Sequence, residues 1–197
     1  MKFSKEENYL READKKLKKI IDLNGHIVFK PEKQNQFNSL VSIVVSQFIS
    51  TKASVSIFNE IKKHFHTDFL DEMHFKNYTI NEIKNLGLSK NKAKTIKDLS
   101  NFFMREDFQE LTKINEKTLH EKLNSIFGIG PWSVNMFEIF CLGKLDIFTS
   151  RDAALRLAMN KFGMIKAENN WKKYDEYAKK WSPYKSIASI HLWRGVD

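Results

Sequence analysis

Gly128 and Gly130 are separated by a single residue and stand directly before Pro131, in a chain with only seven glycines among 197 residues. Glycine lets the backbone adopt positive φ and approach a partner closely, and proline suits the first position of a helix. The N–H groups at a helix start point outward and attract anions such as phosphate. The stretch "LNSIFGIGPWSVNMF" therefore favours a helix–hairpin–helix that binds an anion through its backbone.

Three other interpretations of the glycine pair can be weighed against this one. A dinucleotide-binding motif is excluded, because Ser133 occupies the third glycine position and no strand precedes the pair. A simple helix C-terminus explains Gly128 but leaves Gly130 unexplained. A tight corner between two helices remains open on the sequence pattern alone.

The charge of the chain indicates what the anion could be. Lysine and arginine exceed aspartate and glutamate by nine, and the isoelectric point is about 9.4. Such an excess favours a polyanionic partner, with nucleic acid ahead of a membrane surface, although a solvated lysine-rich surface gives the same count. Aromatic residues make up 13% of the chain, which indicates a folded core.

Several classes of protein are excluded by what the sequence contains. One cysteine, Cys141, cannot form a disulfide framework, a zinc knuckle or a cysteine-ligated cluster, and we expect it to be buried. The six histidines show no paired helical spacing for a metal. The N-terminus lacks a signal-peptide core and no apolar run reaches membrane-spanning length, so we expect a soluble protein of a reducing compartment.

The elements that must position the hairpin are helical. Two capping boxes, Ser4 with Glu7 and Thr79 with Glu82, mark helix starts, and Ser89 is a third N-cap. Ser182 is expected to cap a last helix, with Pro183 at its first position. No segment gives a convincing strand pattern, and 26–29 and 145–148 come closest to one. We expect an all-α, two-lobed protein of about ten helices, in one domain spanning 1–197 with the hairpin near 123–142. Besides the first, helices are expected near residues 14–25, 37–47, 51–65, 79–87, 89–103, 116–126, 131–142, 152–161, 168–181 and 182–194.

Three stretches together carry a resemblance to a known family. The segment "FGIGPWSVNMFEIFCLGKLDIFTSRDAALR" resembles the signature of the helix–hairpin–helix DNA glycosylases, and most of all their 3-methyladenine DNA glycosylase II branch. "LVSIVVSQFISTKAS" and "WSPYKSIASIHLWR" resemble further parts of that branch, in the right order. The resemblance implies a minimal form without the β-rich N-terminal domain of some members.

Asp152 aligns with the essential aspartate of that family. Taken alone, an aspartate before "AALRLAM" is an N-cap, and the two roles are compatible because a helix N-terminus favours the ionised carboxylate. The resemblance implies that this anion stabilises the oxocarbenium-like transition state of N-glycosidic cleavage or orients the attacking water.

The resemblance also assigns the base pocket. Trp132 stands where bifunctional members carry a lysine nucleophile, which implies a monofunctional hydrolase without a Schiff base. Trp193 aligns with a pocket aromatic, and both indoles could attract a cationic alkylated purine. Met136 replaces a pocket aromatic of some relatives, and Phe127 replaces a usual proline, so both alter the pocket or hairpin. Ordinary core packing is the alternative for each tryptophan.

Further residues are assigned to DNA contact. Phe48 aligns with the residue that fills the gap left by an extruded base, and a buried Phe among its apolar neighbours is the alternative. Gly128, Gly130 and Ser133 are expected to bind the DNA backbone. The family's hairpin tends to hold a structural Na⁺ or K⁺ through main-chain carbonyls, here those of Asn124, Ile126 and Ile129, and catalysis needs no cofactor.

The sequence therefore predicts a monomeric glycosylase that excises alkylated purines of the 3-methyladenine or 7-methylguanine type from double-stranded DNA and leaves an abasic site. No membrane partner is expected, and the location is the cytoplasm with the nucleoid in a bacterium or the nucleus in a eukaryote. The alternatives are a glycosylase for another damaged base and a non-catalytic lesion-binding protein of the same fold.

Overall fold

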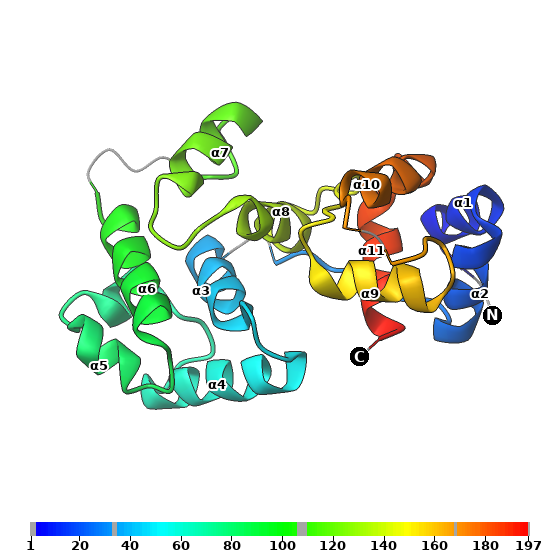
Figure 1. Ribbon diagram of the computed structural model, residues 1–197. Helices are drawn as coiled ribbons and strands as arrows, with labels where there is room; N and C mark the ends of the chain where they lie inside the picture. Colours follow the sequence, from blue (N-terminus) through cyan, green and yellow to red (C-terminus); the bar gives the residue numbers. More distant parts are fainter. Residues whose placement is uncertain (1–2, 33–34, 106–109, 168, 197) are drawn as a thin grey trace. The chain divides into compact units, whose positions relative to one another are not determined.

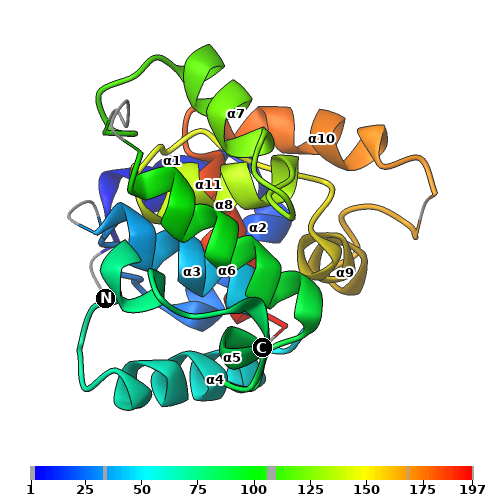
Figure 2. The same cartoon turned by 90° about the vertical axis from the view of Figure 1, so that its left-hand side faces the viewer.

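The computed structural model describes residues 3–32, 35–105, 110–167 and 169–196. Across these ranges the chain forms α-helices and short 3₁₀ helices and no strand, as the sequence predicts. The chain divides into two compact units, which we call the terminal unit (residues 1–30 and 143–197) and the central unit (residues 31–142). Figures 1 and 2 show the helices of each unit from two directions.

The terminal unit is built from both ends of the chain. Its helices are α1 (Lys5–Ala13), α2 (Lys15–Asn24), α9 (Ala153–Lys161), α10 (Lys172–Ala178), η2 (Lys179–Trp181) and α11 (Lys185–Arg194). Helix α11 contacts α1, α2 and α9. Apolar side chains from these helices, among them Leu17, Leu155 and Leu192, form one buried cluster. The terminal unit therefore has its own hydrophobic core.

The central unit contains the predicted hairpin. Its helices are α3 (Gln36–Ser46), α4 (Thr51–His64), η1 (Glu72–Phe75), α5 (Ile80–Lys84), α6 (Lys90–Phe103), α7 (Glu116–Asn124) and α8 (Pro131–Phe140). Helix α3 contacts α4, α6 and α8 and is buried along most of its length. The sequence "FNSLVSIVVS" predicts this burial, because its apolar residues leave no wholly polar face.

Most local signals in the sequence are confirmed. Both capping boxes are present, with Ser4 and Thr79 accepting from the N–H groups of Glu7 and Glu82. Ser89 caps α6. Neither 26–29 nor 145–148 forms a strand. Residue 168, where one predicted helix starts, lies outside the described residues.

The prediction for Ser182 and Pro183 is wrong. Helix α11 begins at Lys185 with Tyr184 as its N-cap, and the Ser182–Pro183 peptide bond is cis. The Ser182 hydroxyl donates to Asp146 Oδ2 at 2.7 Å, and the Tyr184 N–H donates to the Trp181 carbonyl at 2.7 Å. These bonds make a turn where the sequence pattern favours the first turn of a helix.

A buried carboxylate ties α1 to α11 within the terminal unit. Glu7 is fully buried, and its two oxygens lie 2.7 Å from His26 Nδ1 and 3.2 Å from His191 Nε2. Burial alone would raise the pKa of Glu7, but hydrogen bonds from the Ile27 and Ser4 N–H groups, with His26, bring it below its usual value. Burial lowers the pKa of His191 against the opposing effect of Glu7.

Among the described residues, no helix combines the length and the apolar character needed to cross a membrane. Cys141 is buried, as predicted, and burial raises the pKa of its thiol to about 11.

Candidate functional site

The hairpin joins α7 to α8, which pack against each other in the central unit (Figure 1). Between them Gly128 adopts φ +79°, a left-handed conformation that favours glycine. A Cβ at this position would lie 2.1 Å from Thr95 Oγ1 on α6. The fold itself therefore requires glycine at 128.

Gly130 differs from Gly128 in both respects. It is the N-cap of α8 with extended backbone angles, φ −110° and ψ −179°, which any residue can adopt. A Cβ built on it would meet nothing within 4 Å in the described structure. Glycine at 130 therefore leaves the start of α8 open to a close approach.

The start of α8 has the character of an anion site. No side chain of the described residues caps this helix, and Pro131 lies in its first turn. The Val134 N–H makes the first i to i−4 hydrogen bond of α8, donating to the Gly130 carbonyl at 3.1 Å. The positive end of the helix dipole thus lies beside the predicted phosphate contact, the Ser133 N–H.

Gln47 connects this hairpin to the segment that carries Phe48. Its Nε2 donates to the Gly128 carbonyl and to Ser133 Oγ, both at 3.0 Å. Ser133 as a whole is 2% exposed, so its hydroxyl serves this internal bond, and its contact with the DNA backbone stays a prediction. Sequence spacing gives no signal for Gln47, since its partners lie 81 and 86 residues further along the chain.

Phe48 follows Gln47 and is not buried. Its relative exposure is 103%, the largest among the large hydrophobic residues that the structure describes, and it has φ +58°, unusual for a residue other than glycine. The alternative of a buried core phenylalanine is wrong. An exposed phenylalanine on strained backbone is costly for a free protein, which favours a role in contact with a partner.

Asp152 and Trp193 lie together in the terminal unit. Asp152 is 8% exposed and caps α9, its Oδ1 accepting from the Leu155 N–H at 2.8 Å. The same oxygen accepts from Trp193 Nε1, on α11, at 3.1 Å. The turn before Asp152 is held by Asp175, which accepts from the Ser150 N–H at 3.0 Å and from the Ser150 hydroxyl at 2.7 Å. The predicted catalytic aspartate and one predicted pocket tryptophan are therefore joined by a hydrogen bond.

A similar pair occurs elsewhere in the same unit. Asp14 is 5% exposed, caps α2 and accepts from Trp181 Nε1 at 3.0 Å. This pair lies among core residues, and Trp181 is fully buried. An N-cap aspartate bonded to an indole is thus also a structural device in this fold, and the catalytic role of Asp152 stays a prediction.

The other predicted pocket residues lie on α8. Trp132 is half-buried, whereas Met136 is 4% exposed and belongs to the core of the central unit. Phe127 is exposed, and Lys94 Nζ lies 4.5 Å above its ring. Roles for Trp132 and Met136 in base recognition stay predictions.

The three residues expected to hold a monovalent cation lie in or next to the hairpin turn. The carbonyl of Ile126 accepts from the Ile129 N–H at 3.1 Å, which bends the chain back between α7 and α8. A carbonyl oxygen has a second lone pair, so this bond is compatible with a cation ligand. Carbonyl oxygens are the type of ligand that a hard cation prefers, and the site stays a prediction.

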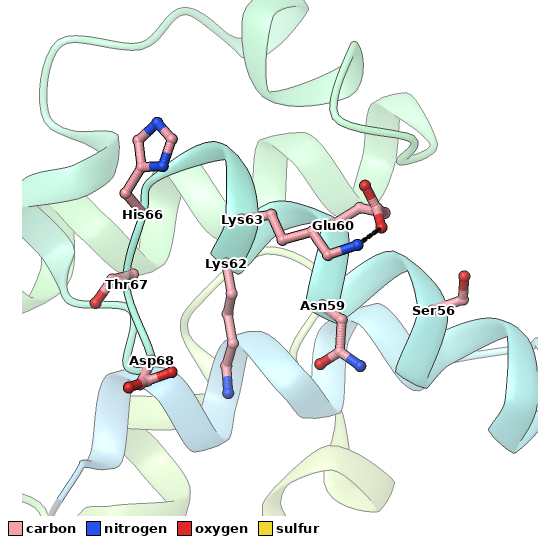
Figure 3. Close-up of a pocket in the computed structure, with 8 residues that line it drawn as sticks. All are labelled: Ser56, Asn59, Glu60, Lys62, Lys63, His66, Thr67 and Asp68. Atoms are coloured by element: carbon pink, nitrogen blue, oxygen red, sulfur yellow. Dashed lines mark hydrogen bonds and ion pairs between the residues drawn. The ribbon is translucent and has the colours of Figure 1, made fainter.

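A hollow in the central unit is lined by none of the predicted site residues (Figure 3). Side chains of both signs line it, including Lys62, Lys63, Glu60 and Asp68, and Lys63 Nζ pairs with Glu60 Oε1 at 2.7 Å. This mixture offers no nucleophile and base in contact. The candidate functional residues therefore form two groups, the hairpin with Phe48 in the central unit and the Asp152–Trp193 pair in the terminal unit.

Comparisons with known proteins show the family of the chain. Residues 41–183 match the model of the HhH-GPD superfamily of base excision DNA repair proteins. The chain belongs to this superfamily.

Similar proteins cover nearly the whole chain. The alkylbase DNA glycosidase-like protein mag2 of Schizosaccharomyces pombe is 23% identical over 98% of this chain and 93% of its own length. The DNA-3-methyladenine glycosylase of Saccharomyces cerevisiae is 26% identical over 98% of this chain and 79% of its own length. Among solved structures, 3-methyladenine DNA glycosylase Mag1 of S. pombe, in complex with abasic DNA, has a TM-score of 0.87 at 22% identity, covering 97% of this chain and 96% of that one. The family and the all-α fold predicted from the sequence are confirmed.

Proposed function

We propose that this protein is a monofunctional DNA glycosylase that hydrolyses the N-glycosidic bond of alkylated purines in duplex DNA and leaves an abasic site. The observation that carries the proposal is the Asp152 carboxylate, held at the start of α9 by the Leu155 N–H and by Trp193 Nε1. It is supported by the superfamily and by relatives named as alkylbase or 3-methyladenine glycosylases.

In the proposed reaction the bond between the deoxyribose C1′ and the purine nitrogen breaks, and the base departs with the electron pair. Positive charge develops on the sugar, and the fixed Asp152 carboxylate stabilises it. Water then adds its hydroxyl to C1′ and releases a proton. An alkylated purine is already cationic, so its departure needs no separate general acid.

The remaining residues bind and expose the damaged nucleotide. The N–H groups around Gly128, Gly130 and Ser133 bind phosphate oxygens at the start of α8, aided by the net charge of +9. Phe48 occupies the gap in the stack left by the extruded nucleotide, whose base stacks on Trp132 and Trp193. Carbonyls of Asn124, Ile126 and Ile129 hold a Na⁺ or K⁺ that stabilises the hairpin.

The absence of lysine at position 132 determines the product. An indole cannot form a Schiff base with the sugar, so the strand stays intact after base release. We further propose a monomer acting with the nucleoid in a bacterial cytoplasm or in a eukaryotic nucleus.

The test is base release from duplex DNA treated with a methylating agent. We expect free 3-methyladenine or 7-methylguanine, strands that break only after alkali, and no covalent adduct on borohydride reduction. A trapped adduct would overturn the monofunctional assignment. Binding to an abasic analogue without release of any methylated base would instead favour the non-catalytic alternative, and release of only deaminated or oxidised bases would indicate another substrate class.

A further inference from the structure

A second cluster of chemistry-bearing side chains lies across the two helices of the hairpin. Glu116 and His120 stand one helical turn apart on α7, and Glu138 lies on α8. One ligand atom from each of the three lies within 4.8 Å of the other two. Histidine spacing in the sequence gives no signal for this cluster, because it contains one histidine and its third member comes from another helix.

The geometry of the cluster suits an ion shared by its members. His120 Nε2 and Glu138 Oε1 are 3.0 Å apart. Two ligands on one ion with bonds of about 2.1 Å are separated by roughly 3.0 Å in octahedral and roughly 3.4 Å in tetrahedral coordination. The third donor, on the exposed Glu116, lies within 4.8 Å of the other two.

Glu138 is the buried member of the cluster. It is 1% exposed, and Asn135 Nδ2 donates to its Oε2 at 3.3 Å, while Oε1 faces His120. A ligating carboxylate whose other oxygen is oriented by a hydrogen bond is typical of metal sites. Placing a carboxylate in the interior is costly, and a bound cation offsets that cost.

Access to the cluster is open. Glu116 and His120 line a hollow of about 670 Å³, whose other lining residues also lie on α7. Two of the three members of the cluster therefore border an open hollow, which leaves room for water as a further ligand.

We propose that Glu116, His120 and Glu138 form a site for a divalent first-row transition ion of the zinc type. Imidazole with carboxylates favours such an ion over Mg²⁺ or Ca²⁺, which prefer oxygen ligands. The ion joins α7 to α8 and so stabilises the two helices that flank the turn with Gly128 and Gly130. This site differs from the proposed monovalent site, which uses main-chain carbonyls.

The test is titration of Zn²⁺ into the chelator-stripped protein by calorimetry, with Mg²⁺ as a comparison. We expect one Zn²⁺ per chain, at least about tenfold weaker binding after Glu116→Gln, and loss of the site after His120→Ala. Glu116 is exposed on α7, so Glu116→Gln separates loss of a ligand from loss of folding. His120→Ala also removes the partner of the buried Glu138, so its folding is checked by chemical denaturation before the titration. Glu121→Gln, on the same helix and lining the same hollow, is the matched control and should bind as the wild type does.

A second measurement locates the ion. Saturating Zn²⁺ should slow amide hydrogen exchange along α7 in the wild type but not in His120→Ala. Wild-type protein that binds no Zn²⁺, or His120→Ala that binds it unchanged, would overturn the proposal. Neither readout depends on glycosylase activity, so the result is independent of the proposed function.

Discussion

Replacing Asp152 by asparagine removes a charge and keeps an oxygen that can accept the two described hydrogen bonds. Both described hydrogen bonds, from the Leu155 N–H and from Trp193 Nε1, go to the same oxygen, Oδ1. An amide carbonyl at that position can accept both. Asparagine is as good an N-cap as aspartate, so we expect the free energy of unfolding to change by less than about 0.5 kcal/mol.

The expected effect on catalysis is much larger. If the carboxylate faces the developing positive charge on the sugar, its removal should slow base release by about 10²-fold or more, which corresponds to at least about 2.7 kcal/mol of transition-state stabilisation. Binding to DNA with an abasic analogue should change little, because the hairpin and Phe48 lie in the central unit and are unaltered. The assay is single-turnover release of 3-methyladenine or 7-methylguanine, measured beside a binding titration.

The chain provides a comparison in Asp14, which also caps a helix and accepts an indole N–H, but through two different oxygens, Oδ1 and Oδ2. Asp14→Asn therefore removes a charge from the same unit together with one acceptor oxygen, and we expect it to lower the stability of the protein but to leave base release by the folded protein unchanged. Release by Asp152→Asn at the wild-type rate would refute the catalytic role and leave Asp152 as an N-cap. Equal losses in both variants would show that the effect arises from the stability of the terminal unit.

Three further predictions test other parts of the molecule. Gly128→Ala should destabilise the fold by about 1–3 kcal/mol in chemical denaturation, through its positive φ and the clash with Thr95. Phe48→Ala should leave the free energy of unfolding within about 0.5 kcal/mol of wild type, because the side chain is exposed, yet weaken binding to the abasic analogue. Because the pKa values of Glu7 and His191 are lowered on folding, their stabilising contribution is present above the usual values of 4.5 and 6.5. Thermal unfolding should therefore shift to lower temperature as pH falls below about 6.5 and again below about 4.5, and a midpoint constant from pH 8 to 4 would contradict this.

The parts of the fold that were predictable are those set by neighbours in the chain. Capping boxes such as Thr79 with Glu82 join residues three apart, so sequence spacing determines them. The buried character of α3 follows from its apolar composition in the same way. At Ser182 the sequence favours an N-cap, but its hydroxyl instead donates to Asp146, 36 residues away.

The parts of the candidate site that were not predictable depend on long-range contacts. Spacing along the chain indicates neither that Trp193 donates to Asp152 nor that Gln47 binds Ser133. The resemblance to a family named Asp152 and Trp193 individually, but their hydrogen bond joins residues 41 apart. Gln47 carries no signal of its own, because a polar residue at the end of a helix is common on any surface.

The two glycines that first mark the hairpin separate the needs of the fold from those of a partner. At 128 the positive φ and the nearby Thr95 demand glycine whether or not DNA is bound. At 130 the backbone is extended and the space around it is open, so the described structure offers no internal reason to exclude a side chain. Gly130→Ala should therefore fold with a loss below about 1 kcal/mol, since alanine is only a weaker N-cap, yet bind duplex DNA less tightly because its methyl group stands where a phosphate would approach. If duplex affinity were unchanged, the start of α8 would not be the phosphate contact, and the glycine pair would mark only a tight corner between two helices.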